Sequence, residues 1–325
     1  MPKAVVCREL GPPERLRLES FASAPLVQGQ VRVAVHAAGI NFPDILMAAG
    51  EYQLKPELPF TPGVEAAGEV IEVTDGVSGV AVGDRVIVRM RHGGYTDEAA
   101  VAPAQLTPLP SNFDYAEGAT FLSAHGTAHH ALVDRGQVKR SEVLLVHGAG
   151  GGVGLAAVEI GKMLGATVIA AASSEEKLAV AQARGADHLV PYGREPFRDA
   201  VKRITDGRGA DVVFDPVGGE IFENSLRCIT WGARVLVIGF TGGIGLAKTN
   251  LLMIKGASVL GVRAGEAVRR SPALGEVRIK ALLEWAEAGK IRPHISHRLP
   301  LEDYAQAMRL LIDRKAIGRV ALTMG

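Results

Sequence analysis

The chain has 325 residues, 47% of them hydrophobic and 39 of them glycines, so it is long enough for two domains with buried cores. Lys and Arg number 36 against 35 Asp and Glu, and the net charge of +1 argues against nucleic acid or a charged membrane as the main partner. The two cysteines, Cys7 and Cys228, are too few for a four-thiolate zinc site and fit a reducing compartment. Without a signal peptide or a bilayer-spanning run, we expect a soluble, cytoplasmic protein.

The first third of the chain predicts β-structure. Short apolar or alternating runs stand between Gly- and Pro-rich turns, which is typical of strands. These runs are residues 31–39, 68–74, 84–90 and 95–102. Together they predict a partly antiparallel, barrel-like sheet. Residues 115–134 follow and look helical, with small side chains on one face.

From residue 143 onward, predicted strands and helices alternate. The strands are 143–147, 167–172, 188–190, 211–215, 233–240 and 257–263. The helices between them are 153–164, 175–185, 197–205 and 220–229. Such alternation predicts βαβ crossovers and a parallel sheet. The last pieces are a helix over 273–290, a strand over 295–300, a helix over 301–316 and a strand over 318–323. They look like the return of the first domain.

A glycine-rich loop between the first strand and helix of this alternating part is the strongest motif. In VLLVHGAGGGVG an apolar strand leads directly through glycines into a helix. Glycines let the loop turn tightly, let its backbone approach a pyrophosphate and let the helix pack close to the strand. The free N–H groups of the helix N-terminus then face the phosphates. We therefore predict a dinucleotide site at Gly148, Ala149, Gly151, Gly152, Val153 and Gly154.

The residues after the second strand of that alternation bear on the choice of dinucleotide. NAD sites place an Asp or Glu there, about 20 residues past the loop, to bind the ribose 2′-hydroxyl. Here Ser173 and Ser174 stand in that place, followed on the helix by Lys177. Hydroxyl and ammonium donors suit a 2′-phosphate, which a carboxylate would repel. We predict NADPH over NADH. The alternative for Lys177 is an ordinary surface lysine.

Stretches along the whole chain resemble the zinc-independent quinone oxidoreductases, a branch of the medium-chain dehydrogenase/reductase superfamily that includes the zeta-crystallins. They are GINFPDIL, LPFTPGVEAAGEV, VGDRV, VHGAGGGVG, ASSEEKL, DVVFDPVGG and IGRVALT. The resemblance implies an α/β protein with a GroES-like catalytic domain over 1–122 and 265–325. It also implies a Rossmann domain over 123–264, and a homodimer or homotetramer.

The resemblance also bears on zinc. Zinc-dependent relatives carry a cysteine in the loop that here reads Gly39-Ile40-Asn41-Phe42. They carry a histidine where Val64 stands, and a lobe with four cysteines where the chain reads MRHGGYTDEA. We therefore expect no metal. Without a Lewis acid, a conjugated acceptor such as a quinone can still be reduced when hydrogen-bond donors stabilise its oxygen.

The loop after the first GroES strand offers two such donors, the Asn41 amide and the Tyr52 hydroxyl. We predict that both hold the acceptor oxygen, with the nicotinamide facing this loop. Asn41 can instead shape the turn, and Tyr52 can instead be a ring packed beside prolines. We expect Asp44 to be the N-cap of a helix that begins at Ile45.

By resemblance, further residues line the cofactor. They are Thr127, Tyr192, Gly239, Phe240 and Arg319. Thr127 can equally be an ordinary helix residue, and Tyr192 a packed ring.

The leading hypothesis is an NADPH-dependent quinone oxidoreductase acting on a small-molecule quinone. One alternative is an enoyl-thioester or alkenal double-bond reductase, in which Tyr52 would match a proton-donating tyrosine. The other is an NADPH-binding or RNA-binding protein with little turnover. The lack of a basic stripe argues against RNA.

Overall fold

The computed structural model describes all 325 residues and divides into two compact units. One consists of Met1–Ser123 and Arg292–Gly325, and the other of Ala124–Ile291. The sequence analysis placed the second boundary at 265, which assigns α9 (Ala264–Arg270) and α10 (Pro272–Glu287) differently. Contacts of α10 explain the observed division. Its Arg278 pairs with Asp134 at 2.9 Å, and both belong to the second unit.

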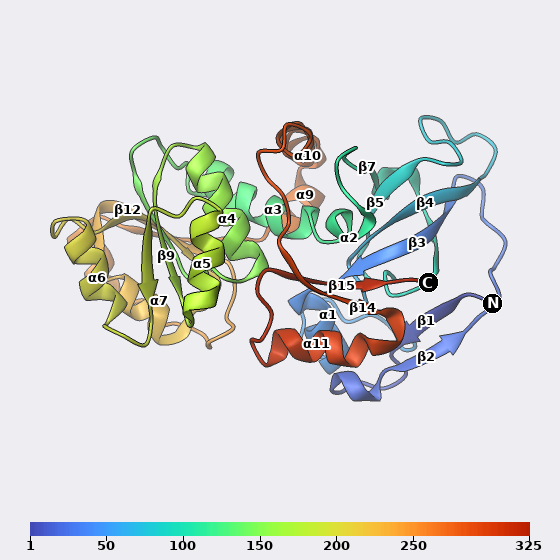
Figure 1. Ribbon diagram of the computed structural model, residues 1–325, viewed down its shortest axis with the longest axis horizontal. Helices are drawn as coiled ribbons and strands as arrows, with labels where there is room; N and C mark the ends of the chain where they lie inside the picture. Colours follow the sequence, from blue (N-terminus) through green and yellow to red (C-terminus); the bar gives the residue numbers. More distant parts are fainter. The chain divides into compact units, whose positions relative to one another are not determined.

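The first unit is built on a seven-stranded sheet in the order β14-β15-β3-β4-β5-β7, with β6 also pairing with β3. All neighbours are antiparallel except β14 and β15. The strands are β3 (Val31–Gly39), β4 (Glu65–Val73), β5 (Arg85–Arg89), β6 (Glu98–Val101), β7 (Leu106–Pro108), β14 (Ile295–Pro300) and β15 (Arg319–Thr323). In Figure 1 the red C-terminal β15 runs beside the blue β3, so both ends of the chain build this unit.

Smaller elements complete the first unit. A two-stranded antiparallel sheet joins β1 (Lys3–Val6) to β2 (Arg17–Ser20). The α-helices are α1 (Phe42–Ala49), α2 (Tyr115–Gly118) and α11 (Tyr304–Ile312), and α3 begins one residue before the unit ends. Three short 3-10 helices are η1 (Pro13–Arg15), η2 (Pro103–Gln105) and η4 (Leu301–Asp303). The core lies between the sheet and these helices, with Val33, Met47, Tyr95 and Met308 fully buried.

The second unit is a six-stranded parallel sheet in the order β10-β9-β8-β11-β12-β13. Its strands are β8 (Val143–Val146), β9 (Thr167–Ala172), β10 (His188–Pro191), β11 (Ala210–Asp215), β12 (Ile229–Val237) and β13 (Ser258–Gly261). Numbered from the first strand, this is the 3-2-1-4-5-6 order of a Rossmann fold. The α/β fold class is confirmed, and we call the units GroES-like and Rossmann.

Helices pack against the parallel sheet as βαβ crossovers require. They are α4 (Gly152–Met163), α5 (Glu175–Ala183), α6 (Phe197–Ile204), α7 (Gly219–Ser225) and α8 (Thr249–Lys255). In Figure 1, α4 and α5 lie against β9, and α4 also contacts β8. None of the helices of the chain combines the length and the apolar character that crossing a bilayer demands.

The helix predicted over 115–134 is wrong as a single element. The chain forms α2, then α3 (Leu122–His129), and then a π-helical stretch, η3 (His130–Arg135). The break follows Gly118. There the Thr120 hydroxyl donates to the backbone oxygen of Ala116 at 2.9 Å, so a side chain takes over an acceptor of the helix backbone.

Candidate functional site

The glycine loop connects β8 to α4 as predicted. Gly148 has a φ of +56°, a left-handed conformation that favours glycine, and Gly151 is the N-cap of α4. At Gly154 a Cβ atom would lie 2.3 Å from the backbone oxygen of Gly148. Only glycine at that position lets the helix pack against its own loop. The N–H of Ala149 donates to Ala171 at 3.1 Å and ties the loop to the end of β9.

The end of β9 presents small hydroxyls. Ser173 is exposed, and the Ser174 hydroxyl caps α5 by accepting from the N–H of Lys177 at 3.3 Å. The first carboxylate, that of Glu175, is exposed and pairs with Arg194 at 2.8 Å. No acidic side chain therefore stands at the position that binds a ribose 2′-hydroxyl in NAD sites.

Beneath the glycine loop, a buried histidine is held by two hydroxyls. His147 has no exposed surface, and its Nδ1 and Nε2 lie 2.9 Å and 2.8 Å from the hydroxyls of Tyr192 and Ser225. Ser225 donates onward to Ile221, so Nε2 carries the proton and Nδ1 accepts from Tyr192. The Tyr192 oxygen also accepts the N–H of Gly148 at 3.2 Å.

Burial alone lowers the pKa of His147 to about 3, which keeps the ring neutral. Burial raises the pKa of Tyr192. The predicted cofactor residue Tyr192 therefore supports the loop from below with a neutral hydroxyl.

The other predicted residues of the Rossmann unit are spread over two elements. Gly239 and Phe240 follow β12, and Phe240 is 54% exposed. A Cβ atom at Gly239 would lie 3.2 Å from the backbone oxygen of Pro216. Thr127 lies half-buried on α3. These assignments remain predictions.

In the GroES-like unit, a buried polar cluster forms where three neighbouring strands begin or end. Gly39 ends β3, Glu65 begins β4 and Arg319 begins β15, and β3 pairs with both other strands. The cluster consists of Asn41, Asp44, Glu65, Tyr95 and Arg319, each at most 7% exposed.

The Asn41 amide is oriented by its partners. Its Oδ1 accepts from Arg319 Nη2 at 2.8 Å, and its Nδ2 donates to the Gly39 oxygen at 3.1 Å. Because a guanidinium can only donate, the oxygen must face Arg319, and one amide hydrogen of Nδ2 is left over. The same Nη2 atom lies 3.8 Å from Glu65 Oε2.

Asp44 supports Asn41 from inside α1. Its Oδ2 accepts both the N–H of Asn41 and the hydroxyl of Tyr95, each at 2.9 Å. The expectation that Asp44 is an N-cap is wrong, because α1 begins at Phe42 and Asn41 occupies the cap position. Asp44 is the third helical residue and reaches back to the cap, as in a capping box.

Burial dominates the ionisation of this cluster. It raises the pKa of Asp44 to about 6, although the hydrogen bonds from Tyr95 and Asn41 and the charge of Arg319 act in the opposite direction. It raises the pKa of Glu65 to about 7 against the charge of Arg319. Burial also lowers the pKa of Arg319, and raises that of Tyr95 well above its usual range.

Tyr52 lies two residues beyond Gly50, the C-cap of α1. Its ring is half-buried against the core, and its hydroxyl makes no hydrogen bond within the chain. A donor without an internal partner can serve a bound molecule.

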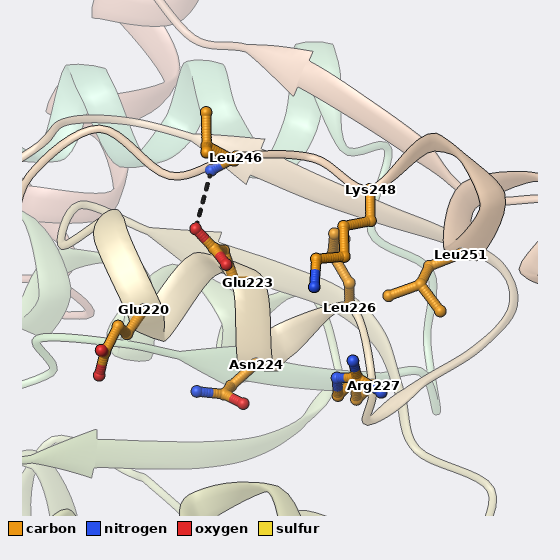
Figure 2. A pocket seen from close by; sticks show the side chains of 8 residues that line it. All are labelled: Glu220, Glu223, Asn224, Leu226, Arg227, Leu246, Lys248 and Leu251. Atoms are coloured by element: carbon orange, nitrogen blue, oxygen red, sulfur yellow. Dashed lines mark hydrogen bonds between the residues drawn. The ribbon is translucent and has the colours of Figure 1, made fainter.

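A hollow of about 320 Å³ lies elsewhere on the Rossmann unit (Figure 2). Residues of α7, α8 and the loop before α8 line it, and Glu223 accepts the N–H of Leu246 at 3.3 Å. Its lining contains none of the predicted site residues.

Comparisons with known proteins agree with both units. Residues 27–113 match the alcohol dehydrogenase GroES-like domain, and residues 152–278 match the family described as zinc-binding dehydrogenase. Quinone oxidoreductase-like protein 2 homolog of Nematostella vectensis is 38% identical over 98% of this chain and 88% of its own. Human quinone oxidoreductase is 32% identical over 99% of this chain and 98% of its own. The structure of Escherichia coli quinone oxidoreductase complexed with NADPH is 28% identical over 99% of both chains, with a TM-score of 0.91.

The chain belongs to the quinone oxidoreductase branch of the medium-chain dehydrogenase/reductase superfamily. It is an oxidoreductase of that superfamily, and the predicted resemblance is confirmed.

One family description names zinc, but the residues of this quinone oxidoreductase-like chain do not fit a zinc ion. The Glu65 carboxylate already faces the Arg319 guanidinium, and the residue before it is the apolar Val64. A divalent cation beside Arg319 would be repelled. No three His, Cys, Asp or Glu side chains converge elsewhere in the chain.

Sequence reasoning missed the roles of His147, Asp44, Tyr95 and Asp215. Asp215 ends β11, and its Oδ1 accepts the N–H groups of Val217 and Gly218 at 2.8 Å and 2.9 Å. A signal was present for His147 and Asp215, because each is the polar end of an otherwise apolar run. No local pattern indicates that Tyr95 reaches Asp44, because the two are 51 residues apart in the sequence.

Proposed function

We propose that this protein is an NADPH-dependent quinone reductase that passes a hydride from the nicotinamide to a small conjugated acceptor. The observation that carries the proposal is the glycine loop followed by Ser173, Ser174 and Lys177 in place of an acidic residue. Support comes also from the relative named quinone oxidoreductase whose structure contains NADPH. The named relatives make a quinone the first acceptor to test.

The acceptor oxygen is held by neutral donors in this proposal. Asn41 presents an amide fixed by Arg319, with one hydrogen left for a ligand. Tyr52 presents a hydroxyl without an internal partner. A hydride delivers two electrons and one proton to a quinone, so the product is a hydroquinone anion with its negative charge on an oxygen, and a proton from solvent completes the hydroquinone. One well-placed donor to such an oxygen is worth about 3 kcal/mol.

No metal takes part in the proposed mechanism. The guanidinium of Arg319 lies beside Glu65 and Asn41. It supplies positive charge at this position in place of a metal ion. When bound, NADPH supplies the hydride. The chain's own residues position the acceptor and stabilise its oxygen.

A second candidate, an enone or enoyl-thioester double-bond reductase, is favoured by the unpartnered Tyr52 hydroxyl. Reduction of a double bond needs a proton at the carbon next to the carbonyl, and a phenol can donate one. Quinone reduction needs no carbon protonation.

The test measures NADPH and NADH oxidation against quinones, enones and enoyl-CoA esters, with metal analysis of the same sample. We expect turnover of quinones with NADPH and no stoichiometric metal. Asn41→Ala and Tyr52→Phe should each lower kcat/KM by about a hundredfold, the effect of losing one oxyanion donor. Tyr304→Phe is the matched control, because that hydroxyl donates to the Leu16 oxygen at 2.6 Å and is not part of the cluster. A preference for NADH would refute the proposed cofactor choice, and stoichiometric zinc would refute the metal-free mechanism. Full turnover by both variants would refute the donor roles of Asn41 and Tyr52.

A further inference from the structure

Gly150 is the one glycine of the loop that the predicted dinucleotide site leaves out. Its φ does not lie in the left-handed region, so its backbone conformation does not require glycine. The space around Gly150, however, does require glycine. A Cβ atom built on Gly150 would lie 2.5 Å, 2.6 Å and 3.0 Å from Cβ, Cγ and Cδ of Lys177. These are the three nearest heavy atoms, and all belong to one side chain.

The clash could not be relieved by rotating the lysine. Cβ is attached to the backbone of α5, and that backbone is held by the Ser174 cap on the N–H of Lys177 at 3.3 Å. The loop is held as well, because Ala149 donates to Ala171 at 3.1 Å at the end of β9. Contact at 2.5 Å between two carbons is far inside the ordinary separation of about 3.5–4.0 Å. An alanine at 150 must therefore displace either the loop or the first turn of α5.

We propose that Gly150 is a specificity-determining residue that acts through Lys177. The absent side chain leaves room for the lysine stem to lie across the loop. Lys177 stands in the first turn of α5, directly after β9, where a Rossmann fold places the adenosine ribose and its 2′-substituent. In this proposal the stem directs the ammonium toward that substituent. Gly150 selects the phosphorylated cofactor without touching it. The inference rests on the proposed preference for NADPH.

The experiment measures the Kd of NADPH and of NADH by fluorescence titration, and kcat/KM with each cofactor, in four proteins: wild type, Gly150→Ala, Lys177→Met and the double variant. Gly150→Ala should lower the NADPH/NADH ratio by about tenfold or more, the range of a lost bond between charged groups, with little change for NADH. In the Lys177→Met background, the same alanine should leave the ratio nearly unchanged. Gly265→Ala is the matched control, because a Cβ atom there meets nothing closer than 3.7 Å.

Each other outcome overturns the inference in a distinct way. Equal losses with NADPH and NADH would show that Gly150 only shapes the loop. An unchanged ratio in Lys177→Met would refute the 2′-phosphate role of the lysine, and with it the inference, while leaving quinone reduction intact. If Gly150→Ala does not fold, adding Lys177→Gly should restore folding, because it removes the three side-chain carbons that clash. The NADPH/NADH ratio of this double variant, Gly150→Ala with Lys177→Gly, should then equal that of Lys177→Gly alone. If the double variant remains unfolded, the proposed clash is refuted.

Discussion

Replacing Tyr95 by Phe removes one hydroxyl from the cluster of the GroES-like unit. Tyr95 has no exposed surface, and its hydroxyl donates to Asp44 Oδ2 at 2.9 Å. Phe fills the same space, so the change in the free energy of unfolding reports the lost hydrogen bond. A hydrogen bond to an ionised group contributes about 1.5–3 kcal/mol, and one between neutral groups about 0.5–1.5 kcal/mol. The cost of Tyr95→Phe should therefore depend on whether Asp44 is ionised.

The sign of this dependence follows from the pKa of Asp44. Burial raises the pKa from 3.8 to about 6 in the folded protein. A raised carboxyl pKa stabilises the fold at low pH, and this contribution is lost as pH rises through the folded pKa. The bond from Tyr95 holds that pKa down, so the Phe variant raises it further. Tyr95→Phe should thus cost more at about pH 8 than at about pH 5, by roughly 1 kcal/mol, since one pKa unit is worth about 1.4 kcal/mol.

The assay must report on the GroES-like unit alone. Both tryptophans, Trp231 and Trp285, lie in the Rossmann unit, so fluorescence cannot serve. Hydrogen exchange of the amides of β3 reports the opening of the correct unit. In an Asp44→Asn background the cost of Tyr95→Phe should no longer depend on pH. Equal costs at the two pH values in the wild-type background would refute the reasoning that Asp44 titrates beneath Tyr95.

Three further predictions concern the Rossmann unit. Because the pKa of His147 is lowered to about 3, the unit should lose about 1.4 kcal/mol of stability per pH unit as pH falls below 6.5. Tryptophan fluorescence should show this slope flattened in His147→Gln, and an unchanged slope would contradict it. Gly154→Ala places a Cβ atom 2.3 Å from a backbone oxygen, and overpacking of about 1–3 kcal/mol should weaken NADPH binding at least tenfold in a fluorescence titration. An unaltered Kd would argue against the close approach of α4 to its loop. Finally, β13 is an edge strand that pairs only with β12, and Trp231, Met253 and Ile254 are 75%, 75% and 60% exposed. We predict a homodimer through this edge, which light scattering should show converted to monomer by Ile254→Lys; a wild-type monomer would refute it.

Much of the architecture could be predicted from the sequence because it depends on local periodicity. Strands and helices alternating from β8 onward indicate parallel βαβ crossovers, and the observed strand order confirms the fold class. The glycine loop was also identifiable, because its glycines lie in one continuous stretch of sequence between β8 and α4. The break in 115–134 was missed, because a side-chain hydroxyl, that of Thr120, takes over a backbone acceptor there.

The sequence by itself determined which chemical groups are present: a glycine-rich turn without an acidic neighbour, and a loop with an amide and a phenol. Tertiary structure alone decided how the groups of the buried cluster are arranged. Arg319 lies 278 residues from Asn41, and they meet because β15 pairs with β3 in the sheet. Likewise, the stem of Lys177 covers Gly150 because α5 packs at the end of β9, beside the loop. Contacts of this kind follow from strand order and packing, which no local spacing of residues encodes.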